Sequence, residues 1–182
     1  MNMHEEEHEL VKQSLTEALI SLMDIKPFSE ITVTELVLKA GVARATYYRN
    51  FSSKEQVLTD YIDEILQSFY NEYPANSMQQ RTQYEHICHI LDYVIKYKSQ
   101  LRILHKSGLS SLYLNGMNKY FFATLNKTAL TADDKFKVYA FAGAEFNIIF
   151  NWIVTGDDEN TKEISSYLKR SMFNSSLFDN NN

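Results

Sequence analysis

The stretch FSEITVTELVLKAGVARATYYRNFSSKEQVL, which runs from Phe28 to Leu58, decides the fold of this chain. Thr32 and Glu35 stand three residues apart, which is the spacing of a capping box and predicts that a helix begins here. Gly41 can adopt the positive φ of a tight turn, and the residues from there to Phe51 contain no helix breaker. Two short helices joined by a tight turn are typical of a helix-turn-helix.

Working outward from this stretch, apolar residues recur at helical spacing on both sides of it. Only five Gly and two Pro interrupt the 182 residues, and β-branched alternation is scarce. A second capping box, Ser52 with Glu55, is expected before a long connecting helix, and the polar segment 75–82 breaks the periodicity after it. The first four predicted helices cover residues 6–23, 33–40, 43–51 and 54–73. A fifth helix ends near residue 97, and four more cover residues 99–106, 109–126, 133–154 and 161–173.

These helices predict an all-α fold in two parts. An N-terminal three-helix domain that contains the helix-turn-helix is expected over residues 1–52, and a C-terminal helical bundle over residues 53–174. The tail over residues 175–182 has too little apolar content to hold a fixed structure, so we expect it to be disordered.

Charge is distributed unevenly along the chain. The net charge of −5 argues against general affinity for nucleic acid. Between residues 26 and 54, however, five basic residues outnumber two acidic ones, Glu30 and Glu35, which is a local excess of +3. A basic patch on an acidic chain is expected where one module contacts DNA. The basic residues are Lys26, Lys39, Arg44, Arg49 and Lys54.

The sequence contains no signal for a membrane or for secretion. No apolar run approaches the ~20 residues of a membrane span, and the first residues are acidic where a secretory signal would be basic. The single cysteine, Cys88, cannot form an internal disulfide. We therefore expect a cytoplasmic protein that does not contact a membrane.

The stretch from Phe28 to Leu58 resembles the N-terminal signature of the TetR family of transcriptional regulators. The resemblance covers roughly the first third of the chain, and the later segment FAGAEFNIIFNWIVTG also looks similar. It implies an operator-binding domain, a dimerising helical domain and no enzymatic activity. The residues that carry it are Ile31-Thr32-Val33, Ala40-Gly41-Val42, Thr46, Tyr48, Phe51 and Ser53-Lys54-Glu55.

The resemblance and the chemistry of DNA together predict the contact residues. Arg44, the second residue of the recognition helix, can form bidentate hydrogen bonds with guanine O6 and N7. Thr32 can offer the start of its helix to a phosphate. Tyr47 stands where the family usually has an apolar residue and is expected to pack inward with Val42 and Phe51. The predicted DNA-binding residues are Thr32, Thr34, Arg44, Ala45, Thr46, Tyr48, Arg49, Asn50 and Lys54.

Two histidine patterns raise the alternative of a metal site. His4 and His8 match H-E-x-x-H, the pattern of zinc hydrolases, but lie at a chain terminus without a third ligand. His86 and His89 can share a helix face, whereas Cys88 points elsewhere on the helical wheel. We expect neither a metal nor a cofactor, and no enzymatic activity.

The apolar stretch 138–154 predicts a subunit interface. It is apolar nearly all round, which indicates burial on more than one side. The resemblance implies that this helix and the next form a four-helix bundle with their copies in a second subunit, and the alternative is the central helix of a monomeric bundle. The predicted interface residues are Ala140, Gly143, Ala144, Asn147, Asn151, Ile164 and Leu168.

Glu145 is the one acidic residue inside this apolar helix. Either it recognises a small-molecule effector or it pairs with a structural partner or with water. A pocket would lie among aromatic side chains, although a filled Tyr/Phe-rich core has the same pattern. The predicted pocket residues are Tyr61, Phe69, Tyr93, Tyr113, Glu145 and Phe146, with Tyr120 as a further aromatic wall.

The predicted function is a homodimeric regulator that binds double-stranded, palindromic operator DNA. The resemblance implies a repressor that a small-molecule effector releases from the operator. The alternative is a regulator or interaction module, such as an activator, whose C-terminal domain binds a partner protein. An enclosed cavity would favour the effector, and a filled core with an exposed apolar patch would favour the protein partner.

Overall fold

The computed structural model describes residues 3–75, 78–81, 83–125, 129–155, 163–164 and 166. All the regular structure within these ranges is helical, which confirms the all-α fold. The elements are α1 (Met3–Ile25), the 3-10 turn η1 (Phe28–Glu30), α2 (Val33–Ala40), α3 (Arg44–Asn50), α4 (Lys54–Glu72), α5 (Met78–Arg81), α6 (Tyr84–Lys96), α7 (Lys98–Lys106), α8 (Ser110–Thr124) and α9 (Ala132–Thr155).

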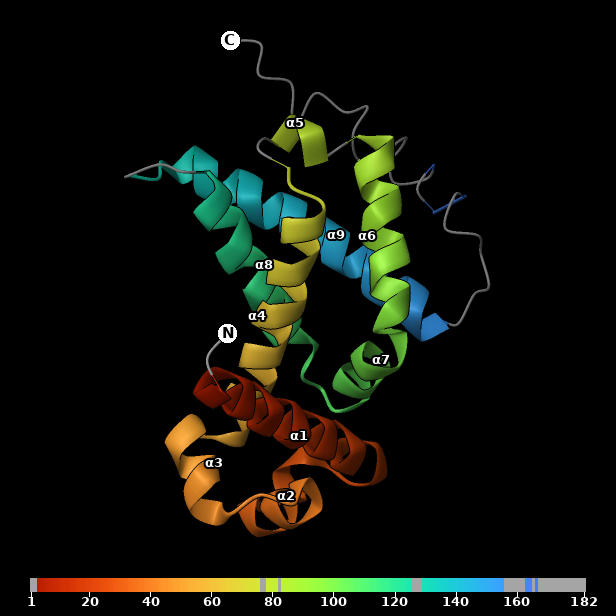
Figure 1. The fold of residues 1–182 in the computed structure, drawn as a ribbon. Helices are drawn as coiled ribbons and strands as arrows, with labels where there is room; N and C mark the ends of the chain where they lie inside the picture. Colours follow the sequence, from red (N-terminus) through yellow and green to blue (C-terminus); the bar gives the residue numbers. More distant parts are fainter. Residues whose placement is uncertain are drawn as a thin grey trace.

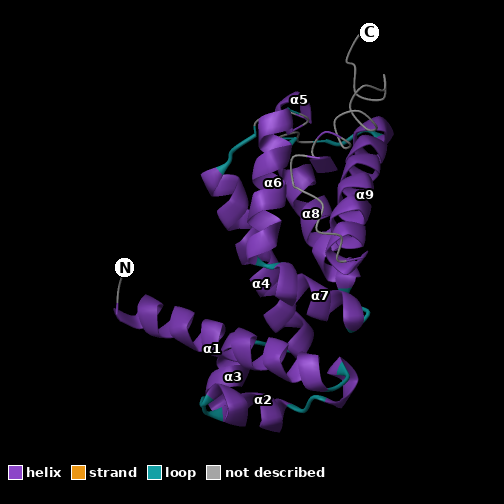
Figure 2. Ribbon diagram, turned by 90° about the vertical axis from the view of Figure 1, so that its right-hand side faces the viewer, coloured by secondary structure: helices purple, strands orange, loops and turns teal. Residues whose placement is uncertain are grey.

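The helices form two parts joined by α4 (Figure 1). The first three helices pack together at one end of the molecule, and α4 leads from them into the C-terminal bundle. Figure 2 shows α1 lying across the base of the bundle, close to α4 and α7, and these three helices are in contact. A displacement of α4 would therefore be transmitted directly to the N-terminal part.

The apolar core of the molecule extends into the N-terminal part. Leu15 and Leu19 of α1 lie one helical turn apart and are fully buried. They lie in one core cluster with Leu36 of α2 and Tyr47 of α3. The apolar stripe of α1 therefore covers the helix-turn-helix.

A glycine controls the packing of α8 against α4. A Cβ atom at Gly116 would lie 2.9 Å from Leu66 Cδ1 and 3.0 Å from Ile62 Cγ2. These distances are too short for ordinary van der Waals contact, so the absence of a side chain lets the two helices approach closely. The long α9 then packs across α7 and α8.

α9 is long and apolar enough to cross a membrane, judged by length and composition alone. The core helix of a soluble protein passes the same test, and side chains such as Val138, Phe141 and Ile153 of α9 are buried inside the bundle.

Two sequence-based predictions about local structure were wrong. The cap of α4 is Ser53, whose side chain accepts a hydrogen bond from Gln56 N, instead of Ser52 with Glu55. Gln56 Oε1 in turn accepts from Ser52 N at 2.7 Å, the residue before the cap, so Gln56 takes the part that was expected of Glu55. The polar segment 75–82 was expected to be irregular, yet it contains α5.

Most of the last predicted helix, over residues 161–173, and the tail over residues 175–182 lie outside the described residues. The described positions there, 163, 164 and 166, are helical.

Candidate nucleic-acid interface

The start of α2 is held by the predicted capping box, which the structure confirms. Thr32 Oγ1 accepts a hydrogen bond from Glu35 N at 3.2 Å, and Glu35 Oε2 accepts one from Thr32 N at 2.9 Å. At the other end of α2, Gly41 has φ 68°, the left-handed conformation that the tight turn requires. These local interactions set the direction in which the chain enters α3.

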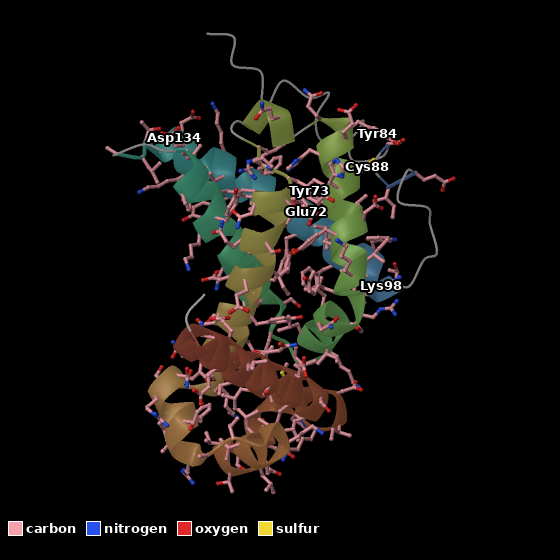
Figure 3. All side chains as sticks on the ribbon, in the orientation of Figure 1. Glu72, Tyr73, Tyr84, Cys88, Lys98 and Asp134 are labelled. Carbon is pink, nitrogen blue, oxygen red and sulfur yellow. The ribbon has the colours of Figure 1, made fainter. Side chains whose placement is uncertain are left out.

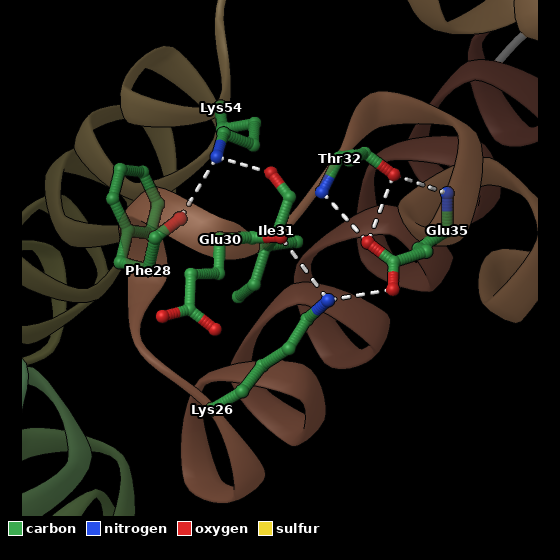
Figure 4. Close-up of polar contacts among 7 residues, drawn as sticks. All are labelled: Lys26, Phe28, Glu30, Ile31, Thr32, Glu35 and Lys54. Carbon is green, nitrogen blue, oxygen red and sulfur yellow. Dashed lines mark hydrogen bonds and ion pairs between the residues drawn. The ribbon is translucent and has the colours of Figure 1, made fainter.

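Lys26 ties the end of α1 to this cap (Figure 4). Its ammonium group lies 2.6 Å from Glu35 Oε1 and donates a second hydrogen bond to the carbonyl oxygen of Glu30 at 3.1 Å. The hydrogen bond from Lys26, followed by those from Thr32, lowers the pKa of Glu35 to about 2. Lys26 therefore has a structural partner inside the domain.

Lys54 has a similar structural role. Its ammonium group donates to the carbonyl oxygen of Phe28 at 2.8 Å and to that of Ile31, and lies 4.5 Å from the centroid of the Phe28 ring (Figure 4). These contacts hold η1 against the start of α4. The predicted contact of Lys54 with a phosphate remains a prediction, and this second role was not expected from the sequence.

One face of α3 is buried and the opposite face is exposed. Tyr47 is fully buried, with its ring 6.2 Å from that of Phe51, which confirms that it packs inward. Tyr48, the next residue, points outward, and its ring meets the edge of the Tyr47 ring at 5.1 Å. The exposed positions of α3 are Arg44, Ala45, Tyr48 and Arg49.

Arg44 connects the two helices of the motif on their exposed side. Its Nη1 donates to Thr34 Oγ1 of α2 at 3.2 Å, and its Nη2 donates to the Tyr48 hydroxyl at 3.1 Å. Three of the predicted DNA-binding side chains therefore lie together at one end of α3. Ala43 caps α3 without a side-chain hydrogen bond, so Arg44 begins the helix next to free backbone N–H groups.

The remaining predicted residues on α3 lie one turn further along. Arg49 Nη2 donates to Thr46 Oγ1 at 3.2 Å, and Asn50 Nδ2 donates to the carbonyl oxygen of Thr46 at 2.7 Å. Arg49 is exposed, whereas Asn50 is half-buried. The outer face of α3 thus presents two guanidinium groups and a phenol, which are suitable donors for base edges and phosphates.

Some of the predicted pocket residues lie together in the bundle. Phe69, Tyr93, Tyr113 and Glu145 line one small void of about 10 Å³. Tyr61 instead lines a separate groove of about 560 Å³ between α1, α4 and α7.

Two further aromatic residues lie beside the void instead of lining it. Phe146 packs against Phe150 with ring centroids 4.5 Å apart, and Tyr120 stacks on Tyr70.

The outward face of α9 carries most of the predicted interface residues. Ala140, Asn147 and Asn151 are exposed, and no other atom lies within 4 Å of a Cβ built on Gly143. Asn147 Nδ2 donates to the Gly143 carbonyl oxygen at 2.7 Å, and Asn151 Nδ2 donates to that of Asn147 at 2.7 Å. Both asparagines lie against their own helix, which leaves the face flat.

The other predicted interface residues differ in position. Ala144 is half-buried and Ile164 is buried within the chain, while Leu168 lies outside the described residues.

The histidine cluster of α6 is not arranged as a metal site. His86 is buried with its ring 5.6 Å from that of Phe69, whereas the exposed His89 stacks on Tyr73 at 4.2 Å. Figure 3 shows Tyr73 at the end of α4 and Cys88 on α6. Within the described residues, no group of three or more His, Cys, Asp or Glu side chains could hold a metal ion.

Sequence reasoning did not identify Arg81, which is 2% exposed and lies against the rings of Tyr70, Tyr120 and Phe121. A single arginine in a polar segment carries no signal of burial, because its environment depends on distant helices.

Known proteins resemble this chain in the N-terminal helix-turn-helix region. Residues 15–61 match the family model of the bacterial regulatory proteins of the tetR family. A curated relative, the HTH-type transcriptional regulator EthR of Mycolicibacterium smegmatis, is 44% identical over 45 residues, which is 25% of this chain and 21% of that protein. The match therefore spans about a fifth of the length of the relative.

Solved structures share the whole fold. A protein from Listeria innocua has a TM-score of 0.76 at 17% identity, covering 93% of this chain and 91% of that one. A TetR transcriptional regulator from a Rhodococcus species has a TM-score of 0.59 at 18% identity, covering 97% and 100%. FadR of Thermus thermophilus, a TetR-family repressor solved in complex with lauroyl-CoA, has a TM-score of 0.50 at 15% identity, covering 87% and 91%.

Two independent observations therefore agree on the N-terminal domain: a capped helix-turn-helix with an exposed recognition face, and a family match over the same residues. The all-α architecture behind this domain agrees with the solved structures. Through residues 15–61, the chain is similar to the bacterial regulatory proteins of the tetR family.

Proposed function

We propose that this chain is a cytoplasmic regulator of transcription that binds operator DNA as a homodimer. The observation that carries the proposal is the outward face of α3, where Arg44, Tyr48 and Arg49 are exposed while Tyr47 anchors the helix in the core. A recognition helix of this kind enters the major groove with its first residues on the base edges. Arg44 lies at that position, so we assign it to base contact and Arg49 to phosphate contact.

The dimer would form through α9. Its exposed face is flat in the middle and carries exposed apolar side chains towards both ends, Phe136 and Tyr139 at one and Val154 at the other. Such a surface suits close packing of another helix, and two-fold symmetry would bring the same face of a second copy against it. Two recognition helices would then contact half-sites about one turn, ~34 Å, or somewhat more apart.

The regulatory step in this proposal is the release of operator DNA on binding of a small molecule. The geometry supports it through α4, which lines the void of the bundle with Phe69 and leads directly into the DNA-binding part. FadR, which has a similar fold, was solved in complex with lauroyl-CoA, and this supports a small-molecule ligand for the present chain. Repression is the form of regulation that we propose.

A second candidate is recognition of a partner protein by the C-terminal part. The observation that favours it is the size of the void, about 10 Å³, which is room for one water molecule at most. An effector must therefore widen the bundle before it can bind. If no small molecule stabilises the protein and the chain is monomeric, the exposed apolar face of α9 becomes the candidate surface for such a partner in place of a second copy.

Selection of bound sequences from random DNA tests the DNA-binding proposal. With the selected site, Arg44→Ala should relax base preference, and Arg49→Ala should weaken binding to all sequences and reduce the salt slope by about one. Lys54→Ala is a poorer probe of phosphate contact, because it also removes the contacts that hold η1. Lys106→Ala, an exposed lysine of α7, is the control. Unchanged affinity in both arginine variants would refute the assignment of α3.

Sedimentation of Gly143 variants tests the dimer. Apart from the adjacent residues and the backbone of its own helix, no atom of the chain lies within 4 Å of a Cβ at this position, so Gly143→Phe should keep the helical content. In the proposed dimer it would collide with the partner helix and yield monomers with weak operator binding. Gly143→Ala is the matched control and should remain a dimer. A monomeric unmodified protein would contradict the proposal.

A further inference from the structure

A cluster of polar groups is buried at the α5 end of the bundle, and nothing in the fold requires it there. We name it the Arg81 cluster. It contains three ionisable side chains from three helices together with the aromatic rings around them: Arg81 of α5, His86 of α6, Glu145 of α9, Phe69 and Tyr70 of α4, and Tyr120 and Phe121 of α8.

Arg81 is buried with an unused donor. Its Nη2 donates to the Ala75 carbonyl oxygen at 3.1 Å, whereas its Nη1 has no hydrogen-bond partner in the described part of the chain. The guanidinium carbon lies 4.9 to 5.1 Å from the centroids of the Tyr70, Tyr120 and Phe121 rings. Aromatic faces attract a cation but do not replace an acceptor, so a buried guanidinium in this state is unfavourable.

His86 adds a second unused nitrogen atom. It is 8% exposed, and its Nε2 has no hydrogen-bond partner among the described residues. Burial, followed by the nearby charge of Arg81, lowers the pKa of His86 to about 4, so the imidazole is neutral at physiological pH. A neutral ring with its proton on Nε2 can donate one hydrogen bond.

Glu145 lies across the cluster and does not neutralise Arg81 by direct contact. No ion pair joins the two within the described residues, although they are close enough for the charge of Arg81 to oppose the pKa shift of Glu145. Burial is the larger effect and raises the pKa of this carboxyl to about 7. A protonated carboxyl group is a hydrogen-bond donor, so near neutral pH the cluster is rich in donors.

The void of the bundle begins at this cluster. Glu145 and Tyr70 line it together with apolar side chains of α4, α6 and α8, among them Leu66, Ile90 and Met117. Tyr70 links the two regions, because its ring lines the void and also carries the Arg81 guanidinium. The arrangement is polar at one end and apolar along its length.

We propose that the Arg81 cluster binds the carboxylate of an amphiphilic small molecule whose apolar part enters the void between α4, α6 and α8. Arg81 Nη1 and His86 Nε2 donate to the carboxylate oxygens. The proposal rests on the proposed function only in identifying this molecule as the effector. Because the void is small, the ligand must move Phe69 and Tyr70 of α4, and this displacement reaches the DNA-binding part through α4 itself.

A cationic ligand is the competing possibility, since Glu145 and the surrounding rings resemble an aromatic box. Two observations oppose it. Arg81 Nη1 is a donor without an acceptor, and a cation cannot supply one. A second positive charge beside the buried Arg81 would also be repelled.

Three compounds with the same ten-carbon alkyl chain distinguish an anionic ligand, a cationic ligand and purely apolar binding. They are decanoate, decylamine and decanol, each added to the full chain of the protein below its critical micelle concentration. We expect decanoate to raise the thermal midpoint and to bind in calorimetry, and the other two to have little effect. Stabilisation by decylamine without stabilisation by decanoate would overturn the proposal. So would equal effects of all three, which would indicate apolar contact alone.

Substitutions in the Arg81 cluster test which side chains bind the carboxylate. Arg81→Met should weaken decanoate binding roughly tenfold to a hundredfold, as expected for loss of a hydrogen bond to a charged group. His86→Phe should weaken it less, and Glu145→Gln, which keeps a donor, should retain it. If Arg81→Met does not fold, Arg81→Lys replaces it; because lysine keeps the charge but not the guanidinium fork, decanoate should bind more weakly than to the unmodified protein and with a reduced preference over decanol. Unchanged decanoate affinity in the Arg81 and His86 variants would refute the assignment.

Operator-binding assays distinguish this proposal from the proposed function. If decanoate binds through Arg81 without changing operator affinity, the anion site stands and the effector part of the proposed function fails. If another class of compound releases the operator and decanoate does not bind, the proposed function stands and the anion site is wrong.

Discussion

Replacing Glu145 by glutamine should change how the stability of the protein depends on pH. The folded carboxyl has its pKa raised from 4.5 to about 7, because burial disfavours its charged form. The folded chain therefore holds this proton more tightly than the unfolded chain does. The resulting stabilisation is fully present below pH 4.5 and is lost as the pH rises through about 7.

The magnitude follows from proton linkage. A difference of one bound proton changes the free energy of unfolding by about 1.4 kcal/mol per pH unit. Over the interval from 4.5 to about 7, the protonated Glu145 is therefore favoured in the folded chain by about 3 kcal/mol. Glutamine does not titrate, so Glu145→Gln lacks this dependence.

Titration of His86 changes the stability with pH in the direction opposite to that of Glu145. In the unmodified protein the two pH dependences therefore mask each other. Its pKa is lowered from 6.5 to about 4, so the unfolded chain binds this proton more tightly. The contribution of neutral His86 is present above pH 6.5 and is lost as the pH falls through about 4. Between pH 4.5 and 6.5 the two side chains nearly compensate, and each becomes visible only when the other is replaced.

The assay is urea unfolding of the unmodified protein and of Glu145→Gln at a series of pH values, all at one protein concentration so that any dimerisation contributes equally. The free energy of unfolding of the variant minus that of the unmodified protein should rise by about 3 kcal/mol from about pH 4.5 to about pH 8. Glu85→Gln, at an exposed position of α6, controls for the loss of a carboxylate. If the difference in the free energy of unfolding stays constant with pH, burial does not raise the pKa of Glu145.

Other predictions concern packing and caps. Gly116→Val should lose about 1 to 3 kcal/mol in chemical denaturation, because the added atoms meet Leu66 where α8 packs on α4. Thr32→Ala should lower the thermal midpoint by removing a cap worth about 1 kcal/mol, whereas Thr32→Ser should retain it. Tyr47→Phe should leave stability unchanged or slightly higher, since its buried hydroxyl is unpartnered in the described structure. In titrations of operator DNA, Tyr48→Phe should weaken binding and Tyr47→Phe should not, because only Tyr48 is exposed.

Sequence reasoning was most accurate where short-range interactions decide the structure. The helix predicted over residues 33–40 has those bounds, because Thr32 with Glu35 caps its start and Gly41 ends it. The inward position of Tyr47 was also predicted correctly, since the face of a short helix follows from the spacing of its residues.

Where two local solutions compete, sequence reasoning was less accurate. Ser52 with Glu55 and Ser53 with Gln56 offer nearly the same cap at the level of sequence, and the structure has the second. In the C-terminal part, the apolar periodicity predicted most of the helices. It did not predict which aromatic residues line the void, since Tyr61 and Tyr93 have the same pattern but line different surfaces.

The basic patch shows this division between sequence and tertiary structure most clearly. Its composition and its place in the helix-turn-helix were sufficient to predict a DNA-binding domain, and the resemblance of residues 28–58 indicated the TetR type. Only the tertiary structure distinguishes its members: Lys26 pairs with Glu35 and Lys54 bonds to the carbonyl oxygens of η1, whereas Arg44 and Arg49 are exposed. The burial of Arg81 beneath three aromatic rings was likewise beyond local sequence. A helix or a cap is stabilised by residues within a few positions, but the environment of a charge is set by helices far away in the chain.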